Sequence, residues 1–185
     1  KEAIYTLFKI YKDSKKRIFV GTGNGLMMLT DIPKKAEPLI FSLPVASFNI
    51  PGLQQTKINV IFEDAEGTTW IGTDKGLFKI TPDGAWQLIT KKNGLAADII
   101  TTIFQDKEKN IWFGSLLGLS KLVTKTNIHV YTMENGLASN SVAFLHTVSK
   151  EHLLVSSEKS AQVFNTHDGK FNSVPSIIDP PFYSV

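Results

Sequence analysis

The fold of this chain is decided by one stretch, Asp64-Ala-Glu-Gly-Thr-Thr-Trp70-Ile-Gly72-Thr73-Asp-Lys-Gly76-Leu77, because the same pattern occurs twice more. The other copies are Asp13-Ser-Lys-Lys-Arg-Ile-Phe19-Val-Gly21-Thr22-Gly-Asn-Gly25-Leu26 and Asp106-Lys-Glu-Lys-Asn-Ile-Trp112-Phe-Gly114-Ser115-Leu-Leu-Gly118-Leu119. A pattern that returns at a fixed period is the signature of one supersecondary unit stacked on copies of itself. The repeat therefore predicts the architecture before any single residue is interpreted.

The period is measured from the glycine after the aromatic residue. Gly21, Gly72 and Gly114 are followed in a poorly matching fourth copy by Ser156, and the steps between these positions are 51, 42 and 42 residues. The longer first step predicts an irregular, proline-rich insertion at residues 30–51. A second landmark, Gly52, Gly94 and Gly136, has the same step of 42 residues. Two landmarks with one period make coincidence a poor explanation.

Each period has the pattern of strands and turns. In the second copy, β-branched and aromatic residues predict strands at 58–63, 69–73, 77–81 and 86–90, separated by turns rich in Gly, Asp and Pro. Four antiparallel strands in about 42 residues are the size of one β-propeller blade. We therefore predict an all-β chain of about four such blades, an incomplete part of a larger propeller of about seven blades. The predicted blades are residues 1–50, 51–92, 93–134 and 135–174, followed by a linker or tail at 175–185.

Composition excludes several classes of protein. Hydrophobic residues make up 42% and charged residues 20%, as in an ordinary soluble domain, and the net charge is only +3. Its basic pairs are scattered over different repeats, so no nucleic-acid-binding face is expected. The absence of cysteine excludes disulfides, cysteine-based zinc sites and thiol nucleophiles. No apolar run approaches the roughly 20 residues of a membrane span, so no membrane contact is expected within this segment.

The repeat resembles the two-component regulator propeller repeat, in its aspartate, its aromatic, its Gly-Thr or Gly-Ser pair and the later Asn-Gly-Leu. The resemblance covers about residues 4–174; it is strong in the second and third copies and poor in the fourth, where Val148 replaces the aspartate and Leu154 the aromatic. It implies the extracytoplasmic sensor region of a hybrid two-component histidine kinase of gut Bacteroides type. In that family the sensor is periplasmic and typically responds to an oligosaccharide, while the kinase lies in another part of the protein. The resemblance therefore implies no enzymatic activity and no cofactor in this segment.

Residues that recur in every copy are expected to serve the frame. Phe19, Trp70 and Trp112 should fill the gaps between adjacent blades. Gly21, Gly72 and Gly114 should admit a neighbouring backbone or that aromatic ring, while Gly25, Gly76 and Gly118 should supply positive φ in the following turn. Hydroxyls of Thr22, Thr73 and Ser115 should cap this turn, and Asp13, Asp64 and Asp106 should open the preceding one. Trp86 has no counterpart in the third copy, so a sugar-stacking role is open to it.

Candidate binding residues are those that differ between copies. In an antiparallel blade, the turn between the second and third strands lies at the same end as the connection to the next blade, and loops on a rigid frame are where binding residues concentrate. Planar amides and carboxylates there are suited to pairs of sugar hydroxyls. The predicted ligand-binding residues are Asn24, Gln55, Asp74, Lys75, Asp98, Asn140, Glu158 and Lys159. Ordinary polar turn residues are the alternative interpretation.

Other functions have less support in the sequence. The four histidines lie on different strands or turns, and His146, which takes the place of Tyr11, Phe62 and Phe104, is interpreted as a core substitution. An enzymatic function, by analogy with lyase-type propellers of similar blade geometry, has no residue that points to it, and no metal site is expected. The main alternative to a sensor is a protein-interaction or dimerisation scaffold, which associates with itself through exposed blade faces or the apolar residues 39–41.

Overall fold

The computed structural model describes residues 7–31, 40–42, 50–124, 127–157 and 160–174, and these residues form four separate sheets of four antiparallel strands. Blade 1 consists of β1 (Leu7–Lys12), β2 (Ile18–Thr22), β3 (Gly25–Asp31) and β4 (Ile40–Ser42). Blade 2 consists of β5 (Ile58–Glu63), β6 (Thr69–Thr73), β7 (Leu77–Ile80) and β8 (Trp86–Ile89). Blade 3 consists of β9 (Ile100–Gln105), β10 (Ile111–Ser115), β11 (Leu119–Leu122) and β12 (Ile128–Tyr131). Blade 4 consists of β13 (Phe144–Thr147), β14 (His152–Ser156), β15 (Ala161–Asn165) and β16 (Phe171–Ser173).

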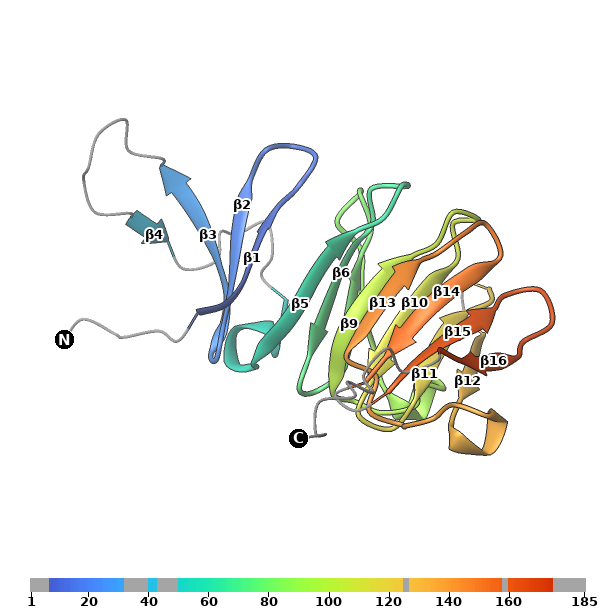
Figure 1. Cartoon of the computed structure of the whole chain (residues 1–185). Helices are drawn as coiled ribbons and strands as arrows, with labels where there is room; N and C mark the ends of the chain where they lie inside the picture. Colours follow the sequence, from blue (N-terminus) through green and yellow to red (C-terminus); the bar gives the residue numbers. More distant parts are fainter. Residues whose placement is uncertain (1–6, 32–39, 43–49, 125–126, 158–159, 175–185) are drawn as a thin grey trace, which may run out of the picture.

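Each sheet is a simple meander whose strands pair in sequence order, and the sheets follow one another in the same order along the molecule (Figure 1). The first strands lie next to each other, with contacts from β1 to β5, from β5 to β9 and from β9 to β13. A short 3-10 helix precedes each of the last three blades: η2 (Leu53–Gln55), η3 (Lys91–Asn93) and η4 (Met133–Asn135). This arrangement confirms the predicted all-β fold of four-stranded propeller blades.

Three apolar cores hold the blades together, and each lies between two consecutive sheets. Phe19 packs between blades 1 and 2, Trp70 between blades 2 and 3, and Trp112 between blades 3 and 4. The Trp70 ring lies 5.3 Å from that of Phe113, centroid to centroid. The Trp112 ring lies 5.4 Å from that of Phe164. The prediction that the repeated aromatic fills the gap between blades is therefore confirmed.

The prediction for the glycine after this aromatic is confirmed in part at Gly21 and corrected at Gly72 and Gly114. A Cβ on Gly114 would lie 2.5 Å from Cγ2 of Thr102 on β9 and 2.8 Å from Cγ1 of Val142, which precedes β13. A Cβ on Gly72 would similarly meet Ile100 of the next blade at 2.7 Å. Gly72 and Gly114 thus admit β-branched side chains of their own blade and the following one, whereas Gly21 is approached by the side chain and the backbone oxygen of Ile58 from the following blade. The glycine sets how closely two blades approach.

The turn after the second strand is built as expected. Gly76 has a φ of +133° and Gly118 a φ of +146°, a region that side chains disfavour. The hydroxyl of Thr73 donates to the Gly76 carbonyl at 2.7 Å and accepts the Lys75 N–H at 3.0 Å. Thr22 and Ser115 make the same pair of bonds in their own blades.

His146 does not lie in a core, which corrects the interpretation from the sequence. Its counterparts Tyr11, Phe62 and Phe104 are half-buried because each packs against the core shared with the following blade. His146 lies on blade 4, the last blade that the structure describes, and its side chain is exposed. The position is a core position only where another blade follows.

Candidate functional site

Three of the predicted binding residues meet at the end of blade 2 where the β6–β7 turn contacts the connection before β5. Lys75 Nζ donates to the backbone oxygen of Gln55 at 3.0 Å. Asp74 accepts hydrogen bonds through Oδ1 from the Thr56 hydroxyl and from the Lys57 N–H. The sequence argument that these two loops share one end is therefore correct here, and all three predicted side chains are exposed.

The other described members of the predicted set bind local backbone. Asp98 accepts the N–H of Lys91 at 2.6 Å, and Asn140 accepts the N–H of Met133 at 2.8 Å. Each side chain therefore caps the first residue of the 3-10 helix that precedes it, η3 for Asp98 and η4 for Asn140. Asn24 is exposed in the β2–β3 turn, beside Gly25, whose Cα faces the backbone of Gln54. Glu158 and Lys159 lie outside the described residues.

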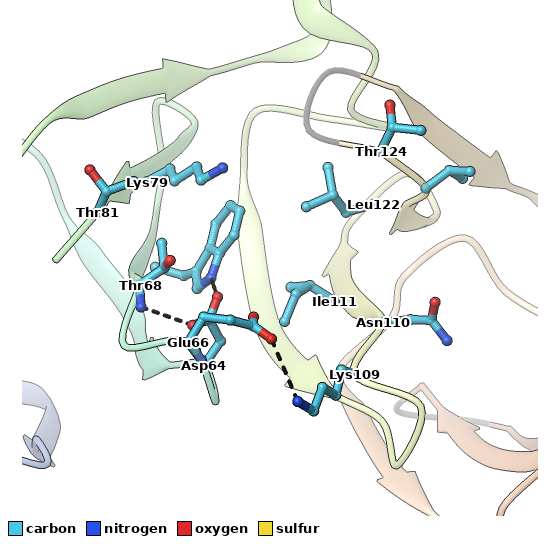
Figure 2. A pocket seen from close by; sticks show the side chains of 12 residues that line it. Asp64, Glu66, Thr68, Lys79, Thr81, Lys109, Asn110, Ile111, Leu122 and Thr124 are labelled. Carbon is cyan, nitrogen blue, oxygen red and sulfur yellow. Dashed lines mark hydrogen bonds and ion pairs between the residues drawn. The ribbon is translucent and has the colours of Figure 1, made fainter.

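A cleft of about 430 Å³ lies at the opposite end of the blades, between blades 2 and 3 (Figure 2). The turns between first and second strands and the segments after third strands form its walls. We call it the blade 2–3 cleft; it is lined by Asp64, Glu66, Thr68, Trp70, Lys79, Thr81, Lys109, Asn110, Ile111, Leu122, Val123 and Thr124. Sequence reasoning did not find it, because its walls come from turns of two different copies that were assigned to the frame.

The floor of the cleft is a fixed hydrogen-bonded unit. Asp64 is buried, and its Oδ2 accepts the indole N–H of Trp70 at 2.8 Å while Oδ1 accepts the backbone N–H of Thr68 at 2.8 Å. Asp106 binds Trp112 in the same way at 2.8 Å in the next blade. The predicted turn role of the aspartate is confirmed by Oδ1, which also accepts the N–H two residues on. Its second oxygen adds a bond to the buried tryptophan that the sequence reasoning missed.

The rim of the cleft carries charges of both signs. The ammonium of Lys79 stands over the Trp70 ring, 5.2 Å from its centroid. Lys109 and Glu66 point toward each other across the opening, with Nζ and Oε1 4.0 Å apart (Figure 2). Both of the latter side chains are largely exposed, so their attraction is weak and either group is accessible to a ligand.

A tryptophan lies beside this cleft. Trp86, on the outer strand β8, is 44% exposed and lines a smaller hollow of about 200 Å³. Lys79 and Thr81 line both hollows, so the two form one continuous surface. The hydroxyl of Thr81 donates to Asp83 at 2.5 Å, and this bond lowers the pKa of the Asp83 carboxyl. The combined surface offers hydroxyls, charged groups of both signs and one exposed aromatic face.

Among the described residues, no group of three or more His, Asp or Glu side chains gathers in a way that could hold a metal ion. None of the helical segments among those residues has the length and apolar character of a membrane span.

The family described as "two component regulator propeller" matches residues 52–75 and 94–116, which run into the second and third copies of the repeat. These two segments are similar to the two-component regulator propeller repeat. The first three copies in this chain share the aspartate, the aromatic residue and the glycine, and the aromatic and the glycine lie at the blade interfaces. No curated protein matches the chain.

Solved structures share the fold of this chain. The extracellular domain of a protein described as a hybrid two component system, BT3049 from B. thetaiotaomicron, is 18% identical with a TM-score of 0.75, over 98% of this chain and 25% of that one. The corresponding domain of BT4673, from the same organism, is 18% identical with a TM-score of 0.52, over 92% of this chain and 31% of that one. Virginiamycin B lyase from Staphylococcus aureus is 14% identical with a TM-score of 0.67, over 94% and 57%. The chain thus spans a quarter to a little over half of these proteins, and at this identity the likeness shows the fold alone.

Proposed function

We propose that this chain is a non-catalytic segment of the extracytoplasmic, periplasmic sensor region of a two-component regulatory system. The observation that carries the proposal is the match of its repeats to the two-component regulator propeller. The likeness in fold to the extracellular domains of two Bacteroides proteins supports it. The kinase activity of such a system would then belong to another part of the protein.

The proposed signal is a carbohydrate, and the blade 2–3 cleft with Trp86 is the candidate site that we favour. Sugars present hydroxyls in all directions and an apolar ring face, so they suit mixed polar groups next to an aromatic plane. Lys109 and Glu66 supply a donor and an acceptor at the rim, and Trp86 supplies the plane. A rigid floor favours such a site, because little is ordered on binding.

The loop residues at the other end remain a second candidate site for the same ligand. Gln55, Asp74 and Lys75 form its described centre, with Asn24 in the adjoining blade. The bonds of Asp74 to Thr56 and Lys57 hold its carboxylate in place and leave Lys75 as the accessible charged group. Lys75 and Lys109 are therefore a matched pair, since both are exposed lysines on turns at opposite ends of the blades.

A carbohydrate microarray probed with the natural chain tests whether the chain binds a glycan. Calorimetry of site variants with the glycan that binds most tightly then tests which site binds it. We expect Lys109→Gln and Trp86→Ala each to weaken binding by about ten-fold, the order of one or two lost polar or stacking contacts. Lys75→Gln should leave it unchanged. Loss of binding in Lys75→Gln alone would move the site to the loop end. The absence of any bound glycan would contradict the carbohydrate proposal.

A further inference from the structure

Lys79 stands inside the blade 2–3 cleft and has no anionic partner there. Its ammonium lies 5.2 Å from the centroid of the Trp70 ring. Within the described part of the chain, no ion pair or hydrogen bond joins that ammonium to another residue. The side chain is half-buried. An ammonium held in this way over a ring keeps its N–H donors for a ligand in the cleft.

The two carboxylates that line the cleft are engaged elsewhere. Asp64 accepts N–H bonds from Glu66, Thr68 and Trp70, so its oxygens serve the β5–β6 turn and the indole of the floor. The side chain of Glu66 is 59% exposed at the rim, where it faces Lys109. Neither carboxylate is bonded to Lys79. The interior of the cleft therefore presents a cationic donor whose charge is not paired.

The wall opposite Lys79 is apolar. It carries Ile111, which is buried, Leu122, which is half-buried, and Val123, which is 53% exposed. Figure 2 shows the Lys79 ammonium directed across the opening toward the wall with Leu122. A ligand that fits between these walls needs an anionic group on one side and an apolar face on the other.

The pair of a lysine and a tryptophan recurs in blade 3, but its surroundings differ. Lys121 repeats the position of Lys79, with its ammonium 5.0 Å from the centroid of the Trp112 ring. Phe164 takes the place of Leu122, and its ring packs 5.4 Å from that of Trp112. The repeat therefore accounts for the lysine and the tryptophan. The smaller leucine accounts for the room in front of Lys79.

We propose that the blade 2–3 cleft binds an acidic sugar, one whose ring carries a carboxylate or sulfate group. This inference rests on the proposed carbohydrate function and narrows it. The anionic group accepts hydrogen bonds from Lys79, and such charge-assisted bonds are stronger than those between neutral groups. The apolar face of the ring lies against Leu122 and Val123, so each side of the sugar meets a matching wall.

A glycan array with matched probes tests the requirement for charge. It carries uronic-acid and sulfated oligosaccharides, each beside a neutral counterpart, which is the methyl ester of the uronic acid or the unsulfated sugar. The natural chain should bind an acidic probe at least about ten-fold more tightly than its counterpart, the order of one hydrogen bond to a charged group. Equal binding of neutral probes would overturn this inference and leave the carbohydrate proposal intact. Binding of no probe would contradict both.

Two lysine variants test the place of the anion. Lys79→Met keeps an aliphatic stem over Trp70 and removes the ammonium, so it should lose most of the preference for the acidic probe in calorimetry. Lys121→Met is the matched control, because Lys121 has the same position over Trp112 and does not line the cleft. It should keep the preference of the natural chain. An undiminished preference in Lys79→Met, or an equal loss in Lys121→Met, would overturn the assignment of the anion to Lys79.

Discussion

At the scale of single residues, the two carboxylate oxygens of the repeated aspartate have different hydrogen-bonding roles. In blades 2 and 3 one oxygen closes a turn and the other binds the indole N–H of Trp70 or Trp112. A buried N–H without a partner costs about 1–3 kcal/mol, so tryptophan and aspartate depend on each other. Blade 1 shows the converse: Phe19 has no N–H, and Asp13 instead binds the guanidinium of Arg17 at 2.6 Å.

Tyr131 leads to a prediction about pH. Burial raises its pKa above the ordinary value of 10.0, because the ring packs among Trp112, Phe164 and Phe171. The folded state then holds the phenol proton more tightly than the unfolded state, so this stability is complete below about pH 10 and is lost as the pH rises above it. Denaturant unfolding at a series of alkaline pH values should show a steeper loss in the natural chain than in Tyr131→Phe.

Burial also raises the pKa of Tyr11, so its contribution to stability is lost at alkaline pH in the same way. Tyr11→Phe in combination with Tyr131→Phe should therefore flatten the alkaline profile further. Identical slopes in the natural chain and both variants would show that neither phenol is linked to folding.

At the scale of the strand, the glycine of each second strand sets the blade spacing. Gly114 has an ordinary backbone conformation, so the reason for glycine here is the space taken by Thr102 and Val142. Ile58 and Ile100 are the counterparts of Val142 at the other two interfaces. Each pair of a glycine and a β-branched residue acts as one unit shared by two blades.

Gly114→Ala should therefore destabilise the chain by about 1–3 kcal/mol, the usual cost of overpacking a filled core. Val142→Ala removes the Cγ1 methyl that would lie 2.8 Å from the new Cβ but leaves Cγ2 of Thr102 at 2.5 Å, so the double variant should recover part of the loss in a denaturant titration. The double-mutant cycle isolates this coupling. If the changes in the free energy of unfolding of the two single variants add in the double variant, contact with Val142 is not the reason for glycine at position 114.

Much of this frame could be predicted from the sequence, because frame residues recur. The period predicts the strands of blade 2 within a residue, as at β5 (Ile58–Glu63) and β6 (Thr69–Thr73). The partner of Gly114 could not be predicted, because Val142 is 28 positions away and a single repeat does not show which face meets which blade. His146 was misinterpreted for a related reason: its register is that of a core residue, but burial depends on the neighbour.

The candidate site was less predictable than the frame. Copy-to-copy variation indicated Gln55, Asp74 and Lys75, which do meet, but also Asp98 and Asn140, which bind their own loops. The blade 2–3 cleft joins Lys79 of one repeat to Lys109 of the next, and neither residue stands out in its own copy. The individual character of Trp86 was the one signal that pointed to this side of the molecule.

At the scale of the whole molecule, the four blades differ in what covers them. Blades 2 and 3 share a core with a neighbour on both sides, whereas blade 4 shares one only with blade 3 among the described residues. Ile10 on β1 is 66% exposed, although its counterpart in blade 2, Ile61, is buried. Stability is therefore expected to be uneven along the row of sheets.

Hydrogen–deuterium exchange at low protein concentration should show this gradient. The slowest amides should lie in β6 and β10, which are inner strands of the doubly covered blades, and β16 should exchange faster. Uniform protection of all four blades would contradict a graded stability.

The three tryptophans give this chain a set of optical reporters, one for each of three locations. Trp70 and Trp112 are buried in successive blade interfaces, whereas Trp86 is accessible beside the cleft. Fluorescence of a variant that retains a single tryptophan would therefore follow the opening of one chosen interface, or the arrival of a ligand at the cleft. The repeated tryptophan therefore provides a separate spectroscopic label in each of two blade interfaces, between blades 2 and 3 and between blades 3 and 4.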